Sequence, residues 1–186
     1  MLDPLVASIV SIGFGLMFLL ASVHKLTGLE RFRTILGDYR VMPGILVPLV
    51  ATAVPALEVA LGLAWLFGSE PRVAGLMTAG LLVLYTSAIA LNLLRGRVHL
   101  SCGCGFGKAA RGDEALSWWL VVRNTALLMA AVAATLPQSE RSIGVLDYGL
   151  LVAALLGVVL LFSAANQLMR NASAINSWRR GVARHD

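Results

Sequence analysis

The stretch LVASIVSIGFGLMFLLASV, residues Leu5–Val23, decides the fold class of this chain. It is uncharged throughout, and a helix needs about 20 predominantly apolar residues to cross the hydrocarbon core of a bilayer. A secretory signal peptide would carry basic residues ahead of such a stretch. The chain instead begins MLDP, with an acidic residue and no basic one. We therefore expect a retained membrane-spanning helix.

Four further apolar runs follow, and the overall composition agrees with them. The chain is 58% hydrophobic and 13% charged, whereas soluble domains carry roughly 25% charged residues. Only helices and closed barrels satisfy their backbone hydrogen bonds in lipid, and these runs lack the alternating polarity of barrel strands. We predict an all-α integral membrane protein with one multi-pass domain over residues 1–168 and a basic polar tail over 169–186. The five spans are expected at residues 5–23, 45–67, 73–94, 118–136 and 146–168.

The segment GLERFRTILGDYRVMPG, residues 28–44, joins the first two spans. Its apolar residues fall at helical spacing with basic residues between them, a pattern that predicts a short amphipathic helix lying at the membrane interface. Pro48 and Pro55 lie inside the second span and predict a kink there, because proline cannot donate a helical hydrogen bond. Small residues at four-residue spacing favour close packing of the first two spans. These stripes are Ala7, Ser11 and Gly15, and Ala56, Ala60 and Ala64.

The distribution of basic residues predicts an orientation. The first and third loops and the tail hold twelve of the 15 lysines and arginines, whereas the second and fourth loops hold two. Because cytoplasmic loops are enriched in Lys and Arg, we expect the N-terminus outside and the C-terminus in the cytoplasm. The net charge of +5 is then explained by the membrane orientation and by anionic lipid, and no nucleic-acid partner is required.

The loop HLSCGCGFGK, residues 99–108, holds both cysteines of the chain, Cys102 and Cys104. A bridge between them would close a small ring that Gly103 is suited to permit, and strained disulfides are easily reduced. Neighbouring basic residues would favour a thiolate. Two alternatives stay open. The cysteines could be reduced residues of a tight turn, or they could bind a soft metal together with His99, although structural zinc requires four ligands.

A second candidate cluster lies inside the membrane. Glu58 lies near the middle of the second span, where an uncompensated charge costs at least about 2.5–3.5 kcal/mol. Arg123, followed by Asn124 in the fourth span, is the candidate partner. Lys25 and His24 end the first span, where a lysine usually extends its ammonium group to the interface. With five spans, these two residues, the cysteine loop and Arg123 should lie towards one membrane face.

These features together resemble the MauE family, the methylamine-utilisation membrane proteins within the wider DoxX-like group. The resemblance rests on "ASVHKL", "FRTILGDYRVMP", "PALEVALGLAWL", "SCGCGFGK" and "RNTALL" over about residues 8–130. It implies a four-helix core followed by a C-terminal helix. It also implies a role in thiol–disulfide chemistry at the bacterial inner membrane, with a thioredoxin-like partner and exported, disulfide-rich clients.

Carried over to this chain, the resemblance makes Cys102 and Cys104 the redox pair, and Glu58, Arg123 and Asn124 the polar core beneath them. A quinone could accept electrons, although no residue requires one, and we expect no metal. Two other functions stay open, a non-catalytic membrane subunit or scaffold for a periplasmic enzyme or oxidase complex, and a soft-metal transporter. The charge distribution places the cysteine loop on the cytoplasmic face, whereas the implied role is periplasmic. The loop could be reached from outside, or electrons could cross the membrane.

Overall fold

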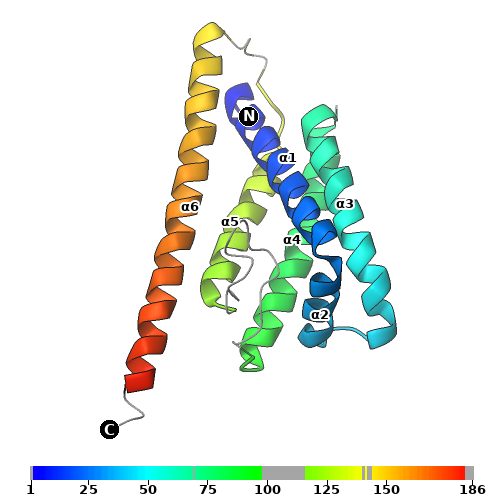
Figure 1. Ribbon diagram of the computed structural model, residues 1–186. Coiled ribbons are helices and arrows are strands. Elements are labelled where there is room, and N and C mark those ends of the chain that lie inside the picture. Colours follow the sequence, from blue (N-terminus) through cyan, green and yellow to red (C-terminus); the bar gives the residue numbers. More distant parts are fainter. Residues whose placement is uncertain (1, 69, 98–115, 140, 142–143, 183–186) are drawn as a thin grey trace. The chain divides into compact units, whose positions relative to one another are not determined.

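The computed structural model describes residues 2–68, 70–97, 116–139, 141 and 144–182. Regular structure in these ranges is helical, apart from a single parallel bridge between Leu2 and Gln138. The predicted all-α fold class is confirmed. In chain order the elements are α1 (Pro4–Thr27), α2 (Leu29–Tyr39), the short 3-10 helix η1 (Gly44–Leu46), α3 (Val47–Phe67), α4 (Pro71–Leu94), α5 (Trp118–Ala133) and α6 (Val145–Val182) (Figure 1).

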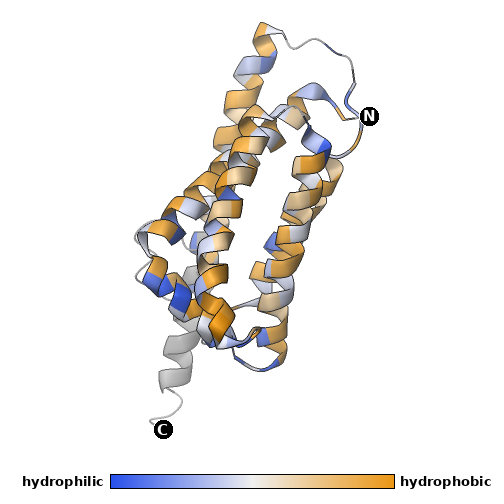
Figure 2. Ribbon diagram, turned by 90° about the vertical axis from the view of Figure 1, so that its right-hand side faces the viewer, coloured by the Kyte–Doolittle hydropathy of each residue, from blue (hydrophilic) through white to orange (hydrophobic). Residues whose placement is uncertain are grey.

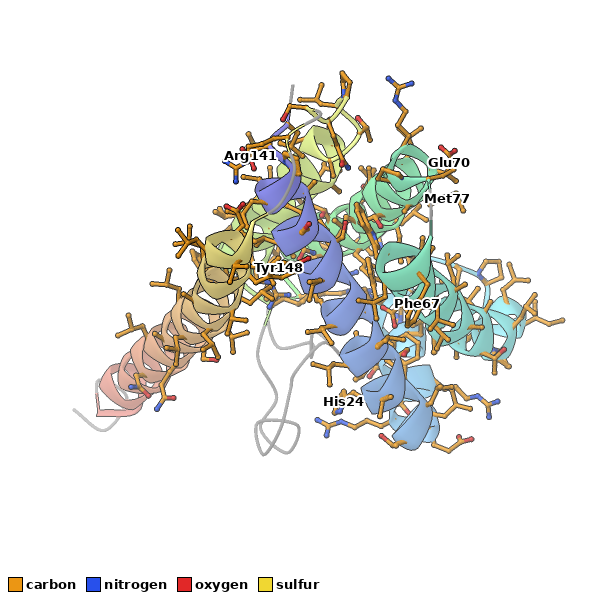
Figure 3. All side chains as sticks on the ribbon, turned by 90° about the horizontal axis from the view of Figure 1, so that it is seen from above. His24, Phe67, Glu70, Met77, Arg141 and Tyr148 are labelled. Atoms are coloured by element: carbon orange, nitrogen blue, oxygen red, sulfur yellow. The ribbon has the colours of Figure 1, made fainter. Side chains whose placement is uncertain are left out.

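The apolar helices agree with a membrane-embedded bundle. Within the described residues, four stretches are long and apolar enough to cross a membrane: Pro4–Thr27, Gly44–Phe67, Pro71–Leu94 and Val145–Ala165. Helix α5, with 16 residues, extends only about 24 Å, less than a hydrocarbon core of about 30 Å. The helices are hydrophobic along most of their length (Figure 2). Phe67 and Met77 are among the exposed apolar side chains (Figure 3).

The chain forms two compact units, Met1–Ser142 with α1–α5 and Ile143–Asp186 with α6. Helix α6 has 38 residues and continues from its apolar part into the basic segment that follows residue 168. All the predicted site residues belong to the first unit.

Helices α1 and α3 are antiparallel and approach each other closely at two glycines. A Cβ atom on Gly15 would lie 2.6 Å from the Leu66 side chain, and one on Gly62 would lie 3.2 Å from the Gly15 carbonyl oxygen. The small-residue stripe predicted on the first span is confirmed at Ala7 and Gly15, which are buried. The stripe predicted on the second span is wrong as a packing surface, because the face of α3 that carries Gly62 packs on α1. Its three alanines are exposed instead: Ala56, Ala60 and Ala64.

Two apolar clusters occupy opposite ends of the first unit. The larger one lies where α3 ends and α4 begins, and there the Phe14 and Trp65 rings stack with centroids 5.2 Å apart. The indole Nε1–H of Trp65 donates to the Thr78 hydroxyl over 2.9 Å. The second cluster lies where α4 ends and α5 begins, and it contains Tyr39, Ile89, Leu93, Leu116 and Leu120.

Helix α2 forms as predicted, and two side chains of its apolar side are buried within the bundle. Phe32 and Tyr39 are buried, and Tyr39 belongs to the cluster at the end of α4. Arg95 and Arg97, which follow α4, donate to the carbonyl oxygens of Arg40 and Asp38. These bonds hold the C-terminal end of α2 against the end of α4. Helix α2 therefore covers the part of α3 that extends beyond the end of α1.

Candidate functional site

Lys25 and Glu58 form a buried ion pair between α1 and α3. The Lys25 ammonium donates to Glu58 Oε1, and the two side chains are only 4% and 1% exposed. Glu58 is eleven residues from the start of α3, which is about 16 Å along the helix axis. Burying either charge at this depth without the other would cost much free energy. The ion pair is therefore the electrostatic centre of the bundle.

Two aromatic side chains complete this cluster. The Tyr85 hydroxyl, on α4, donates to Glu58 Oε1 over 2.7 Å. The Lys25 ammonium nitrogen lies 5.3 Å from the centroid of the Tyr85 ring and 5.6 Å from that of Phe32 on α2. Both distances are within the range of cation–π attraction. Lys25, Glu58, Tyr85 and Phe32, called the Lys25–Glu58 cluster below, thus join four helices around one ion pair.

The sequence-based pairing of Glu58 with Arg123 is wrong. Among the residues that the structure describes, Glu58 bonds to Lys25 and Tyr85. The expectation that Lys25 extends to the interface is also wrong. Helix α1 ends beside the middle of α3, and α2 follows α1 and covers the rest of α3. Although Lys25 is near the end of α1, its side chain lies inside the bundle, where its ammonium group neutralises the Glu58 carboxylate at the same level.

The other predicted site residues are distributed as follows. Asn124, on α5, is buried, and Arg123 is half-buried. His24, labelled in Figure 3, is half-buried near the end of α1. Cys102 and Cys104 lie outside the described residues, as does His99. Within the described part of the chain, no three His, Cys, Asp or Glu side chains are grouped as metal ligands would be.

Sequence reasoning missed Tyr85, although a periodic signal was present. Trp65 on α3 bonds to Thr78 on α4, and Glu58, seven residues earlier, bonds to Tyr85, seven residues later. The antiparallel helices therefore meet at intervals of two turns, about 10.5 Å. One interval of seven further along each helix are Ala51 on α3 and Asn92 on α4, and both residues are completely buried. Thr78, Tyr85 and Asn92 form a polar stripe on an otherwise apolar helix.

The opposite end of the bundle is closed by contacts of the N-terminal segment. Leu2 pairs with the backbone beyond α5, through Leu2 N–H to Pro137 O and Ser139 N–H to Leu2 O, each 2.9 Å long. Asp3 caps α1 by accepting a hydrogen bond from the Leu5 N–H. Its other carboxylate oxygen, Oδ2, lies 3.6 Å from the Arg141 guanidinium nitrogen Nη1. Helix α1 thus starts at one end of the bundle, and residues 97 and 116, which flank the cysteine segment, lie at the other.

Comparisons with known proteins give one consistent result. Residues 3–137 match the family model "Methylamine utilisation protein MauE". The chain is 32% identical over 141 residues to methylamine utilization protein MauE of Paracoccus denitrificans, covering 75% of this chain and 74% of that one. It is 33% identical over 152 residues to the protein of the same name from Paracoccus versutus, covering 80% of each chain. The Methylophilus methylotrophus protein is 36% identical over 102 residues, 55% of this chain and 54% of that one. No solved structure matches the chain significantly.

Proposed function

The chain belongs to the MauE family, and on that basis we propose that it supports methylamine utilisation as a membrane thiol–disulfide exchange protein. The observation that carries the proposal is the Cys102-Gly103-Cys104 sequence. It holds both cysteines of the chain and lies within the residues that match the family model. The chemistry would be exchange with a thioredoxin-like partner that serves exported proteins.

The proposed exchange proceeds through a mixed disulfide. One thiolate of the pair attacks the disulfide of the partner, so that a new S–S bond forms as the partner's own S–S bond breaks. The partner's departing thiolate takes up a proton. The second cysteine then attacks the mixed disulfide and releases the partner as a dithiol. In total, two electrons and two protons pass from this chain to the partner, and the reverse sequence oxidises the partner.

The basic residues around the pair support this chemistry. Arg97 precedes the cysteines, and Lys108 and Arg111 follow them, so a thiolate formed there would be stabilised by nearby positive charge. The Lys25–Glu58 cluster is proposed as the polar core that fixes the helices beneath the pair. Arg123, Asn124 and His24 remain proposed supporting residues.

We also propose that the protein lies in the bacterial inner membrane with its N-terminus outside. Lys25 is paired inside the bundle, so it no longer counts as a loop charge. The count of loop and tail Lys and Arg residues is then eleven on the predicted cytoplasmic face against two on the outer face. This distribution still favours an N-terminus outside.

Growth and trapping experiments test the proposed exchange. The full chain is expressed in a Paracoccus denitrificans strain that lacks its own MauE, and growth on methylamine is measured. We expect growth with the native chain and loss of growth when Cys102→Ser and Cys104→Ser are combined. One of the single variants should accumulate a mixed disulfide, visible as a non-reduced species that disappears on reduction. Undiminished growth of the double variant would reject thiol exchange and favour the scaffold function.

A further inference from the structure

In the part of the first unit that the structure describes, the buried polar side-chain atoms that lack a hydrogen-bond partner lie in one half. Among the described side chains they include Glu58 Oε2, Asn92 Oδ1 and Trp119 Nε1. Asn92 lies two residues before the end of α4, and Trp119 is the second residue of α5. All three atoms therefore lie between the level of the Lys25–Glu58 cluster and the end of the bundle where α4 ends.

A backbone acceptor on α3 lies in the same half. Pro55 lies inside α3, and because proline has no N–H, the carbonyl of Ala51 loses its regular helical donor. Ala51 is completely buried, so bulk solvent does not replace that donor. The register of α3 against α4 places Ala51 at the level of Asn92, about 10.5 Å from Glu58 along the helix.

The other half of the bundle, from the Lys25–Glu58 cluster to the start of α4, is packed with apolar side chains. It contains the apolar cluster around Phe14, Phe18 and Trp65, and the indole of Trp65 is paired with the Thr78 hydroxyl. The two glycine contacts bring α1 and α3 together there, with no space for a Cβ atom. Within the described residues, no side-chain nitrogen or oxygen on this side is buried without a hydrogen-bond partner.

We propose that water reaches Glu58 from the end of the bundle where α4 ends, and that the opposite half is sealed against water. Leaving a buried donor or acceptor unpaired costs about 1–3 kcal/mol, and buried water is the usual partner for such groups. Water both donates and accepts, so it can serve Glu58 Oε2, the Ala51 carbonyl, Asn92 Oδ1 and Trp119 Nε1.

The proposed water path opens at one end of the bundle only. Protons would therefore reach the Lys25–Glu58 pair from a single membrane face. Among the described residues, the titratable groups in contact with Glu58 are Lys25 from α1 and Tyr85 from α4, and α2 contributes the neutral Phe32 ring. Water at Glu58 Oε2 would connect this cluster to the solution at the end of α4, whereas the Trp65–Thr78 level blocks the other direction. The inference uses neither cysteine, so it does not rest on the proposed thiol exchange.

Reaction of single introduced cysteines with a charged methanethiosulfonate reagent tests the path. The background is the full chain with Cys102→Ser and Cys104→Ser, in membrane fragments whose two faces both meet the reagent. Ala51→Cys reports the proposed wet half and Ala131→Cys the sealed half, because Ala131 is a completely buried alanine of the apolar cluster. Leu84→Cys is the lipid-facing control, since Leu84 is 67% exposed on α4 beside Tyr85. We expect Ala51→Cys to react at least about tenfold faster than both others, because the reactive thiolate forms in water.

Two further variants keep the test decisive. If Ala51→Cys lowers the helical content, Ala88→Cys replaces it, because Ala88 is half-buried one turn before Asn92. Adding Asn92→Leu should slow the reaction at the wet position, because it removes an acceptor that binds the water. The proposal is overturned if the wet position reacts no faster than Ala131→Cys, or if Asn92→Leu leaves its rate unchanged. Because the readout requires no activity, it is independent of the growth test on methylamine.

Discussion

Replacement of Lys25 by methionine should destabilise the protein strongly. Methionine is unbranched like lysine and one atom shorter, and it removes the charge and the hydrogen-bond donors, so Glu58, 1% exposed, loses its counter-ion. Its Oε1 keeps the Tyr85 hydroxyl as a donor. Breaking a buried pair by removing one partner costs about 3–5 kcal/mol. Water at Glu58 Oε2, as proposed above, would move the cost towards the lower end of that range.

The double variant Lys25→Met/Glu58→Gln should recover most of the loss. Glutamine is neutral and still offers Tyr85 an oxygen, so no buried charge remains. Replacing both partners of a buried pair is often close to neutral. We therefore expect the double variant to be at least about 2 kcal/mol more stable than Lys25→Met, because residues in direct contact are strongly coupled.

Equilibrium unfolding in mixed micelles, followed by circular dichroism, measures these free energies. The control is Arg33→Met, which breaks the Arg33–Glu30 pair on α2, 2.7 Å long with side chains 35% and 85% exposed. An exposed pair of this kind contributes about 0.3–0.5 kcal/mol. The reasoning would be refuted if Lys25→Met cost no more than the control, or if the double variant were as unstable as the single one.

Two smaller predictions concern the sealed half of the bundle and use the same unfolding assay. Gly15→Val should lose about 1–3 kcal/mol through overpacking against Leu66. Gly13→Ala should instead gain about 0.5–1 kcal/mol, because a Cβ atom there meets nothing within 4 Å and alanine is favoured over glycine inside a helix. Equal losses would contradict the close approach at Gly15. Thr78→Val should cost about 1–3 kcal/mol of unfolding free energy, because it leaves the Trp65 indole without its acceptor. Thr78→Ser keeps the hydroxyl and should keep most of the native stability. If the serine variant were as unstable as the valine variant, the lost hydrogen bond would not be the cause of the instability.

The candidate site was predicted only in part. Glu58 was identified because a carboxylate in an apolar run is a local anomaly that composition alone reveals. Its partner was not identified, because the nearest charge in space depends on where α1 ends relative to α3. That offset is set by the Gly15–Gly62 contact and by the continuation of the chain into α2. Tyr85 was missed for the same reason, because its role exists only in the register of α4 against α3.

The sequence alone was enough to predict that the chain is helical and apolar enough for a membrane, and that the segment 28–44 contains a short amphipathic helix. Length and periodicity are properties of a single segment, so no neighbour is needed to establish them. The tertiary structure decided that α2 packs against α3 and α4, that Lys25 neutralises Glu58, and that the buried polar atoms without partners share one half of the bundle. These features depend on the axial offset and crossing of several helices, and the residues of one helix do not specify them.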